Sequence, residues 1–189
     1  MRFKVKILAA TIVAGLFCNT LTAVESGFVT RLGYGLINIK EEFGGSTVQT
    51  HDTGTLDIYL GYRMQNLQFG FSYVRADFFY EVRGLKDYSE ATGVQFLASG
   101  AYVFENIHDK IKPFLGLGFG KFYFTVDDGK PGAIYESGTF GTANAGVNVE
   151  YEHFFYGAEL RERIFGGAGT GDYEVIPQDT YMFYVGYKF

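Results

Sequence analysis

Large apolar residues recur at every second position along most of the chain. In the stretch 67–74, they alternate strictly with smaller or polar residues: Leu67, Phe69, Phe71 and Tyr73. Successive side chains of a β-strand point to opposite faces, so this pattern predicts strands with one apolar and one polar face. The interleaving also explains why mean hydropathy is only +0.02 although 47% of residues are hydrophobic.

The first 23 residues differ from the rest. Three basic residues precede an apolar run at 7–17, and Ala23 offers a small residue for cleavage. The run is about half of the roughly 20 residues that a membrane helix needs. We therefore predict a cleaved signal peptide at 1–23 and a single β domain at 24–189. The segment also contains the only cysteine, Cys18, so the remainder can form no disulfide.

The charge balance excludes nucleic acid as a partner. Residues 1–23 contain three of the 16 basic residues and none of the 21 acidic ones, so the mature chain is distinctly acidic. Nucleic-acid binding needs a basic footprint.

Extending the alternation predicts eight strands, at 27–39, 54–63, 67–80, 92–104, 111–125, 139–151, 154–165 and 179–189. Short turns (64–66, 105–110 and 152–153) alternate with longer connections (40–53, 81–91, 126–138 and 166–178). This asymmetry is typical of outer-membrane barrels, in which tight periplasmic turns alternate with longer extracellular loops and both termini are periplasmic. The expected fold is an all-β, eight-stranded antiparallel up-and-down transmembrane β-barrel.

A soluble lipocalin-like cup would show the same periodicity with its faces reversed. A barrel with its apolar face outward is favoured, because the small and polar face carries residues suited to a wet or hydrogen-bonded interior, including Gln68, Gln95, Asn144 and Asn148. Tyrosines on the apolar face suit lipid headgroups. Lipocalins also carry a tryptophan near the start, and this chain contains none.

The last strand resembles the terminal strand of Gram-negative outer-membrane proteins, with hydrophobic residues at alternate positions: Tyr181, Phe183, Val185, Tyr187 and Phe189. The segment from Lys112 to Phe124 resembles the glycine-alternating strand of the OmpA/OmpX/opacity-type barrel family. The resemblance implies that these five alternate residues of the last strand are an assembly signal for the barrel-assembly machinery. It also implies an environment of outer-membrane lipid and lipopolysaccharide.

By strand parity, seven charged residues face the interior: Arg31, Asp57, Arg63, Glu150, Glu159, Arg161 and Arg163. Buried charges need partners or water. Two interpretations remain open: a salt-bridged plug, which an eight-stranded interior favours, and a narrow ion path.

Catalysis has little support in the sequence. His51, Asp52 and Ser46 loosely imitate the loop residues of lipid A palmitoyltransferases, but nothing in the sequence fixes their geometry. No spacing suggests a metal, and we expect no cofactor. The leading hypothesis is a non-enzymatic barrel with a structural or surface-interaction role, such as envelope integrity, adhesion or host contact. The alternatives are a narrow porin for ions or small solutes and, less favoured, a lipid A-modifying enzyme.

Overall fold

The computed structural model describes residues 26–43, 46–81, 88–105, 109–127, 134–170 and 173–189. The predicted signal peptide at 1–23 lies outside these ranges. Within them, no helix is long and apolar enough to cross a membrane.

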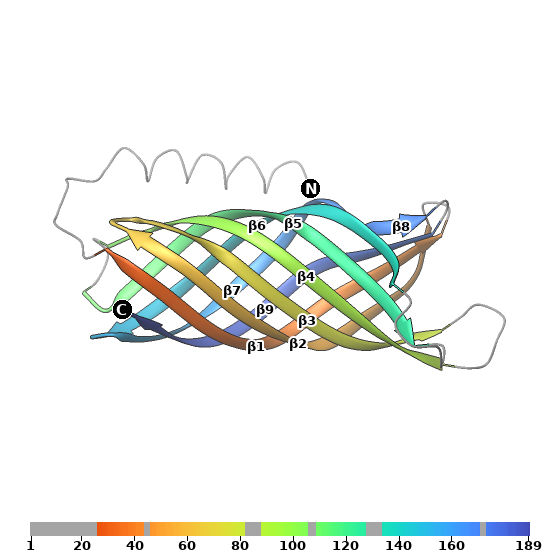
Figure 1. Ribbon diagram of the computed structural model, residues 1–189, viewed down its shortest axis with the longest axis horizontal. Helices are drawn as coiled ribbons and strands as arrows, with labels where there is room; N and C mark the ends of the chain where they lie inside the picture. The colour runs from red at the N-terminus through yellow and green to blue at the C-terminus, as the bar shows by residue number, and fades with distance from the viewer. Residues whose placement is uncertain (1–25, 44–45, 82–87, 106–108, 128–133, 171–172) are drawn as a thin grey trace.

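The described chain is a closed antiparallel barrel (Figure 1). Each long strand pairs with the next, and pairing of the first with the last closes the sheet. The strands are β1 (Gly27–Phe43), β2 (Ser46–Met64), β3 (Leu67–Glu81), β4 (Tyr88–Val103), β5 (Ile111–Asp127), β6 (Ile134–Tyr151), β7 (Phe154–Gly166), β8 (Ala168–Thr170) and β9 (Tyr173–Lys188). The eight long strands confirm the predicted fold; the three-residue β8, which pairs with the outer part of β9, was not predicted.

The three short connections lie at one end of the barrel, together with the C-terminus and the start of β1 (Figure 1). We call this the turn end and the opposite one the loop end. Two of these turns contain only two residues between strands, and Gln65 and Glu152 each adopt a φ of 55° there. The left-handed conformation reverses the chain tightly. The short turns predicted at 64–66 and 152–153 are confirmed, whereas part of the one predicted at 105–110 lies outside the described residues.

The strands extend further at the loop end than predicted. β1 and β2 are paired as far as Phe43 and Ser46, so most of the expected loop 40–53 is a β-hairpin. Strands likewise take up parts of 81–91, 126–138 and 166–178. These extensions lack regular apolar alternation, and hydrogen bonds between backbones hold them without a sequence signature.

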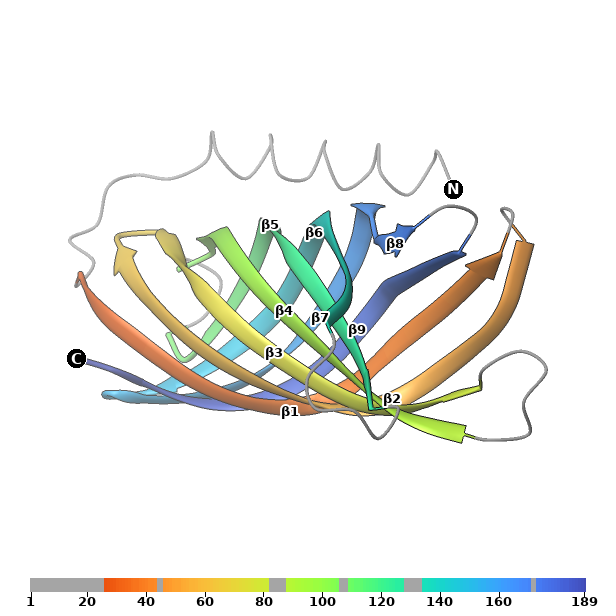
Figure 2. The same cartoon turned by 45° about the vertical axis from the view of Figure 1, so that its right-hand side comes forward.

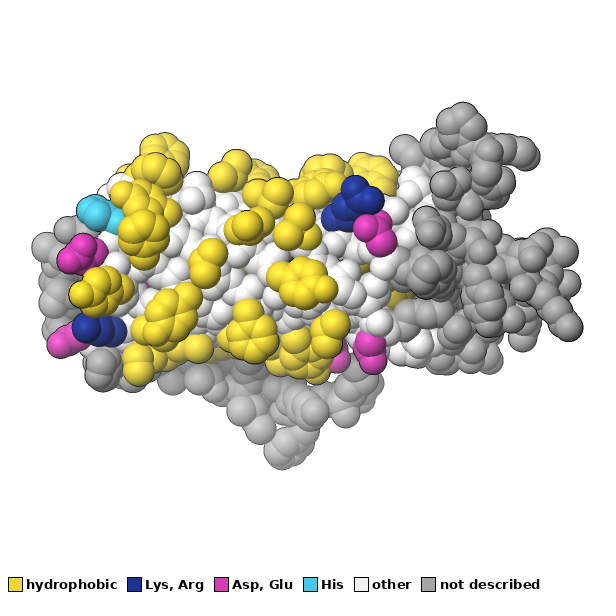
Figure 3. Space-filling view, turned by 90° about the horizontal axis from the view of Figure 1, so that it is seen from below, with side chains coloured by type: hydrophobic (Ala, Val, Ile, Leu, Met, Phe, Trp, Pro, Cys, Tyr) yellow, Lys and Arg dark blue, Asp and Glu magenta, His cyan; other side chains and the backbone are white. Residues whose placement is uncertain are grey.

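The outer wall is apolar. The large hydrophobic side chains on it include Phe71 and Phe183, which are 71% and 74% exposed. Figure 3 shows hydrophobic side chains distributed over one side of the wall, with charged side chains nearer its two ends. On the same strands the intervening positions, such as Ser72 and Met182, are buried. The apolar face therefore points outward, as predicted, and opposite to a soluble cup.

Candidate functional site

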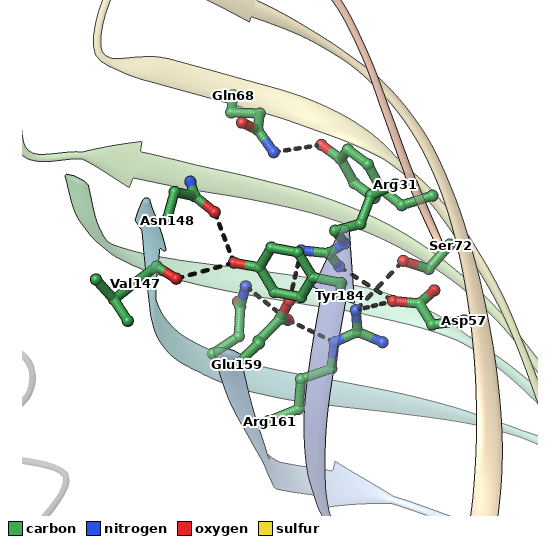
Figure 4. Close-up of polar contacts among 11 residues, drawn as sticks. Arg31, Asp57, Gln68, Ser72, Val147, Asn148, Glu159, Arg161 and Tyr184 are labelled. Carbon is green, nitrogen blue, oxygen red and sulfur yellow. Dashed lines mark hydrogen bonds and ion pairs between the residues drawn. The ribbon is translucent and has the colours of Figure 1, made fainter. Parts of the chain in front are cut away.

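A compact cluster of four charged side chains crosses the middle of the barrel (Figure 4). Arg31 comes from β1, Asp57 from β2, and Glu159 and Arg161 from β7. All four face inward because they occupy the parity opposite to the exposed apolar residues. Each is at most 8% exposed.

The two arginines share the two carboxylates. Arg31 Nη2 lies 3.1 Å from Asp57 Oδ2, and its Nη1 lies 2.6 Å from Glu159 Oε2. Arg161 Nη2 donates to the same Asp57 oxygen at 2.8 Å, and its Nε donates to Glu159 Oε1 at 2.6 Å. Charges buried this deeply persist because every one has an opposite charge in direct contact. The cluster has no formal net charge.

Arg31 also lies between two aromatic rings. Its guanidinium carbon is 4.6 Å from the ring centre of Tyr59 and 4.5 Å from that of Tyr184. The tyrosines are fixed in turn, because Gln68 Nε2 donates to the Tyr59 hydroxyl at 3.2 Å and Tyr184 donates to Asn148 Oδ1 at 2.6 Å. Both rings therefore hold the cation in place on faces that carry partial negative charge.

Glycines make room for these rings. A Cβ atom on Gly70 would lie 2.5 Å from the Tyr59 ring, and one on Gly157 would lie 2.6 Å from the Tyr184 hydroxyl. On β5, a Cβ on Gly118 would lie 2.7 Å from Thr142 Oγ1. Glycine ordinarily weakens a strand, but here it admits inward side chains from the neighbouring strand.

A second charged group lies at the turn end. Arg63 forms ion pairs with Glu105 and Glu150, and Lys112 Nζ lies 2.7 Å from Glu105 Oε2. Arg63 and Glu150 were among the predicted interior charges, whereas Glu105 and Lys112 were not. Parity places Lys112 on the glycine face of β5, so the sequence did contain a signal for it. Glu105 follows the end of β4, where no periodicity applies.

Arg163 joins neither group. Its side chain is half-buried and donates to the backbone oxygen of Gly166 on its own strand. The register between β6 and β7 shifts just beyond it, because Thr142 pairs with Arg163 but Gly141 pairs with Phe165. Arg163 lies beside this bulge, two positions further toward the loop end than Arg161. Of the seven predicted charges, four meet at mid-barrel, two meet at the turn end and Arg163 stands apart from both groups.

Two apolar clusters fill the spaces next to these charges. The one between the two charged groups contains Val29, Tyr59, Val103, Phe114, Phe155 and Tyr184. The one toward the loop end contains Ile37, Ile39, Ala76, Ala91, Leu97, Phe122, Phe124, Phe140 and Val175. Strand parity puts Tyr59 and Tyr184 on the inner face, but most of the other large inward residues were not predicted, because apolar side chains on both faces of a strand hide the alternation. The described interior is thus a stack of charged and apolar layers.

Of the residues considered for catalysis, Ser46 begins β2, and His51 and Asp52 are consecutive in that strand. The side chains of Ser46 and His51 lie outside the described part of the structure. Among the described residues, no three His, Cys, Asp or Glu side chains are grouped so that they could hold a metal ion.

The terminal strand β9 presents the residues of the predicted assembly signal on the outer wall. Tyr181, Phe183, Val185 and Phe189 are 55%, 74%, 62% and 68% exposed, and Tyr187 is half-buried. Tyr187 makes edge-to-face contacts with Phe154 and Phe189, at centroid distances of 5.0 and 4.8 Å. In the closed barrel both edges of the strand are occupied, by β1 and β7.

Solved structures share this architecture. The crystal structure of Neisserial surface protein A aligns with a TM-score of 0.69 and 18% identity, covering 88% of this chain and all of that one. The outer membrane protein OprG from Pseudomonas aeruginosa aligns with a TM-score of 0.65 and 14% identity, covering 86% and 96%. This chain has the fold of the small outer-membrane β-barrels.

The NMR solution structure of outer membrane protein W from E. coli is more distant, with a TM-score of 0.51 and 15% identity over 89% of this chain and 100% of that one. No protein-family model matches the sequence. No curated protein shows significant sequence similarity to it. The likeness is therefore one of fold, carried by the strand pattern and not by shared sequence.

Proposed function

We propose that this protein is a non-enzymatic integral barrel of the bacterial outer membrane that anchors β-hairpins at the cell surface. Its role is structural or surface-interacting, in envelope integrity, adhesion or host contact. The observation that carries the proposal is the inverted barrel: side chains such as Phe71 and Phe183 face outward, while Asp57 and Arg161 are buried inside. Only a hydrocarbon surrounding favours that arrangement. Outer-membrane lipid and lipopolysaccharide are its surroundings.

The orientation follows from the two unequal ends. Short turns and both ends of the barrel domain lie together at the turn end, and the long hairpins lie at the other. In outer-membrane barrels, the short turns are periplasmic. We therefore place both termini in the periplasm and the hairpins outside the cell.

The layered interior favours a structural anchor and argues against a channel. Two neutral ion-pair groups and two apolar clusters occupy successive levels, and an eight-stranded barrel leaves little room beyond its side chains. Planar-bilayer recording tests this. Purified, refolded protein should show no conductance steps above the lipid baseline, and reproducible steps would favour the narrow porin.

The terminal strand gives the proposed route to the membrane. The outward-facing residues from Tyr181 to Phe189 can be recognised before the barrel closes. At that stage an edge of β9, which later pairs with β1, is still free to add to another sheet. The partner is the barrel-assembly machinery.

Two measurements test the location and the role. On a density gradient, the protein should float with the outer-membrane fraction. It should also migrate differently on a gel with and without boiling. Recovery of the protein in the soluble fraction would contradict the proposal. Replacing the hairpin tips should abolish cell or matrix binding while leaving that gel shift intact. Lipid A mass spectra should be unchanged by expression of the protein, whereas a change lost on His51→Ala would favour the enzyme.

A further inference from the structure

The outer wall of β6 is flat beside a ridge on β5. The two strands lie side by side, and β7 follows on the other side of β6 (Figure 2). Toward the loop end, the outward residues of β6 include the half-buried Ala143 and Ala145. The adjacent outward residues of β5, Leu117 and Phe119, are 55% and 57% exposed. The wall therefore has a step here that a surface of complementary shape can fill.

Two charged side chains border this step. Lys121 is the next outward residue after Phe119 on β5, and Glu162 lies on the outer face of β7. Both are exposed, and within the described ranges neither forms a hydrogen bond or an ion pair. Glu162 has Leu160 and Ile164 on either side, which are 39% and 52% exposed, so its carboxylate belongs to the apolar wall. A charge that faces lipid is unfavourable unless it has a partner.

The register of the sheet determines the depth of both charges in the membrane. One line of paired residues passes once around the barrel and returns to β1 ten residues nearer the loop end: Gly27, Arg63, Gln68, Ala101, Gly116, Asn144, Arg161, Thr180 and Ile37. For eight strands, such a shift corresponds to strands inclined by about 40° to the barrel axis.

Lys121 and Glu162 therefore lie at nearly the same depth. Glu162 pairs with Ala143, which pairs with Leu117, so one line joins Leu117 to Glu162. With strands about 4.8 Å apart and inclined by about 40°, this line rises by about 6 Å toward the loop end. Lys121 is four residues beyond Leu117 on the same strand, which is a rise of about 10 Å. The remaining difference of about 4 Å is within reach of a long, flexible lysine side chain.

The two charges also lie on opposite sides of Leu117, because the strands incline in one direction and the lines of paired residues in the other. In an isologous contact, residue i of one copy meets residue j of the other, and j meets i. A two-fold axis along the membrane normal leaves the depth of every residue unchanged. With this axis at Leu117, Lys121 of each copy faces the side of the other that carries Glu162, and Phe119 of each copy meets Ala143 of the other.

Lipid alone satisfies only part of this face. Acyl chains cover Leu117 and Phe119, but they leave the ammonium group and the carboxylate without partners in surroundings of low polarity, where opposite charges attract most strongly. A second copy supplies an opposite charge for each of them. The small side chain of Ala143 also lets the two walls approach closely.

We propose that this face binds a second copy of the chain within the membrane, around a two-fold axis at Leu117. The contact consists of Leu117, Phe119, Lys121, Ala143 and Glu162 of each copy. Such a dimer goes beyond the proposed function, which needs only a single barrel.

Cross-linking tests the position of the contact. Residues 24–189 contain no cysteine, so a single one can be introduced at a chosen site. In vesicles with a large excess of lipid, Leu117→Cys should form dimers with a short bis-maleimide. Phe71→Cys is the matched control, because Phe71 is 71% exposed but lies on β3, and it should stay monomeric. Equal cross-linking of both variants, or none at Leu117→Cys, would overturn the proposal.

Charge exchange tests the pairing of Lys121 with Glu162. Lys121→Glu and Glu162→Lys should each weaken association about tenfold, measured by energy transfer between labelled copies in vesicles. The double variant restores an opposite pair and should associate nearly as the wild type does. A double variant as weak as the single ones would refute the contact.

The heat-dependent gel shift shows whether each variant is folded. If the charge variants do not fold, cross-linking of Leu117→Cys decides the matter. Flotation of the wild type with outer membranes tests the proposed function separately, so the two failures are distinguishable.

Discussion

Arg161 on β7 reaches across the barrel to Asp57 on β2, with 2.8 Å between Nη2 and Oδ2, although the two residues are 104 positions apart in the sequence. Asp57 also contacts Arg31, so one fully buried carboxylate neutralises parts of two guanidinium groups. This shared contact ties strands from opposite sides of the interior, and its removal has a calculable consequence.

Asp57→Asn should destabilise the barrel by about 3–5 kcal/mol, because it leaves two buried arginines opposite a single carboxylate. Adding Arg161→Met restores charge balance by leaving the Arg31–Glu159 pair, which is 2.6 Å apart. The double variant should therefore lose less stability than the sum of the single variants. Urea unfolding of refolded protein in vesicles, followed by gel mobility, measures all of them. Strict additivity would show that the cluster is not coupled.

Phe122→Ala should cost about 3–5 kcal/mol if the loop-end interior is packed, because it opens a cavity. Phe122 is 1% exposed, whereas Phe119 on the same strand faces outward and is 57% exposed. Phe119→Ala is the matched control and should cost clearly less. The same urea titration applies, and a negligible effect of Phe122→Ala would mean that water fills this level.

Phe71→Arg and Phe183→Arg should each lower the stability of the refolded barrel by about 2–4 kcal/mol, since both place a charge in the hydrocarbon region. The two side chains are almost equally exposed, at 71% and 74%, but only Phe183 belongs to the terminal strand. If that strand is the assembly signal, Phe183→Arg should slow assembly in cells more than Phe71→Arg does. Pulse–chase labelling with the gel-shift assay compares them. If both variants assembled equally slowly, the delay would come only from the charge in the hydrocarbon region and not from a signal in the terminal strand.

Deleting Phe189 should impair insertion further. Its backbone N–H donates to the Phe28 carbonyl at 2.9 Å, and its ring lies against Tyr187. Phe154→Ala removes another ring that contacts Tyr187, but it changes no residue of the terminal strand. Outer-membrane yield should fall sharply for the deletion and little for the control. Normal yield of the deletion variant would show that Phe189 is dispensable as a signal.

The sequence was sufficient to predict the faces of the strands, and much of the central cluster follows from that. Parity alone put Arg31, Asp57, Glu159 and Arg161 on the inner face, since a residue's side of a sheet depends only on counting from its neighbours. It could not show that they touch, because contact between β2 and β7 depends on how the barrel closes. Barrel closure is a property of the whole sheet.

The extensions at the loop end were missed for a different reason. Glu41 and Gln49 pair through their backbones, and such pairing leaves no apolar pattern in the sequence. The bulge beside Arg163 was also invisible, since a single inserted residue shifts the register without changing the local composition.

The seam between β1 and β9 also determines when the barrel can form. Val29 pairs with Lys188 and Leu36 with Tyr181, so the first strand to be synthesised must wait for the last. Contacts so distant in sequence make folding slow. Until the barrel closes, the sheet exposes unpaired strand edges and its apolar outer face, which makes this intermediate prone to aggregation. The protein is thus most prone to aggregation before its barrel closes. The closed barrel has no such exposed edges, but the unclosed chain needs a chaperone that shields it.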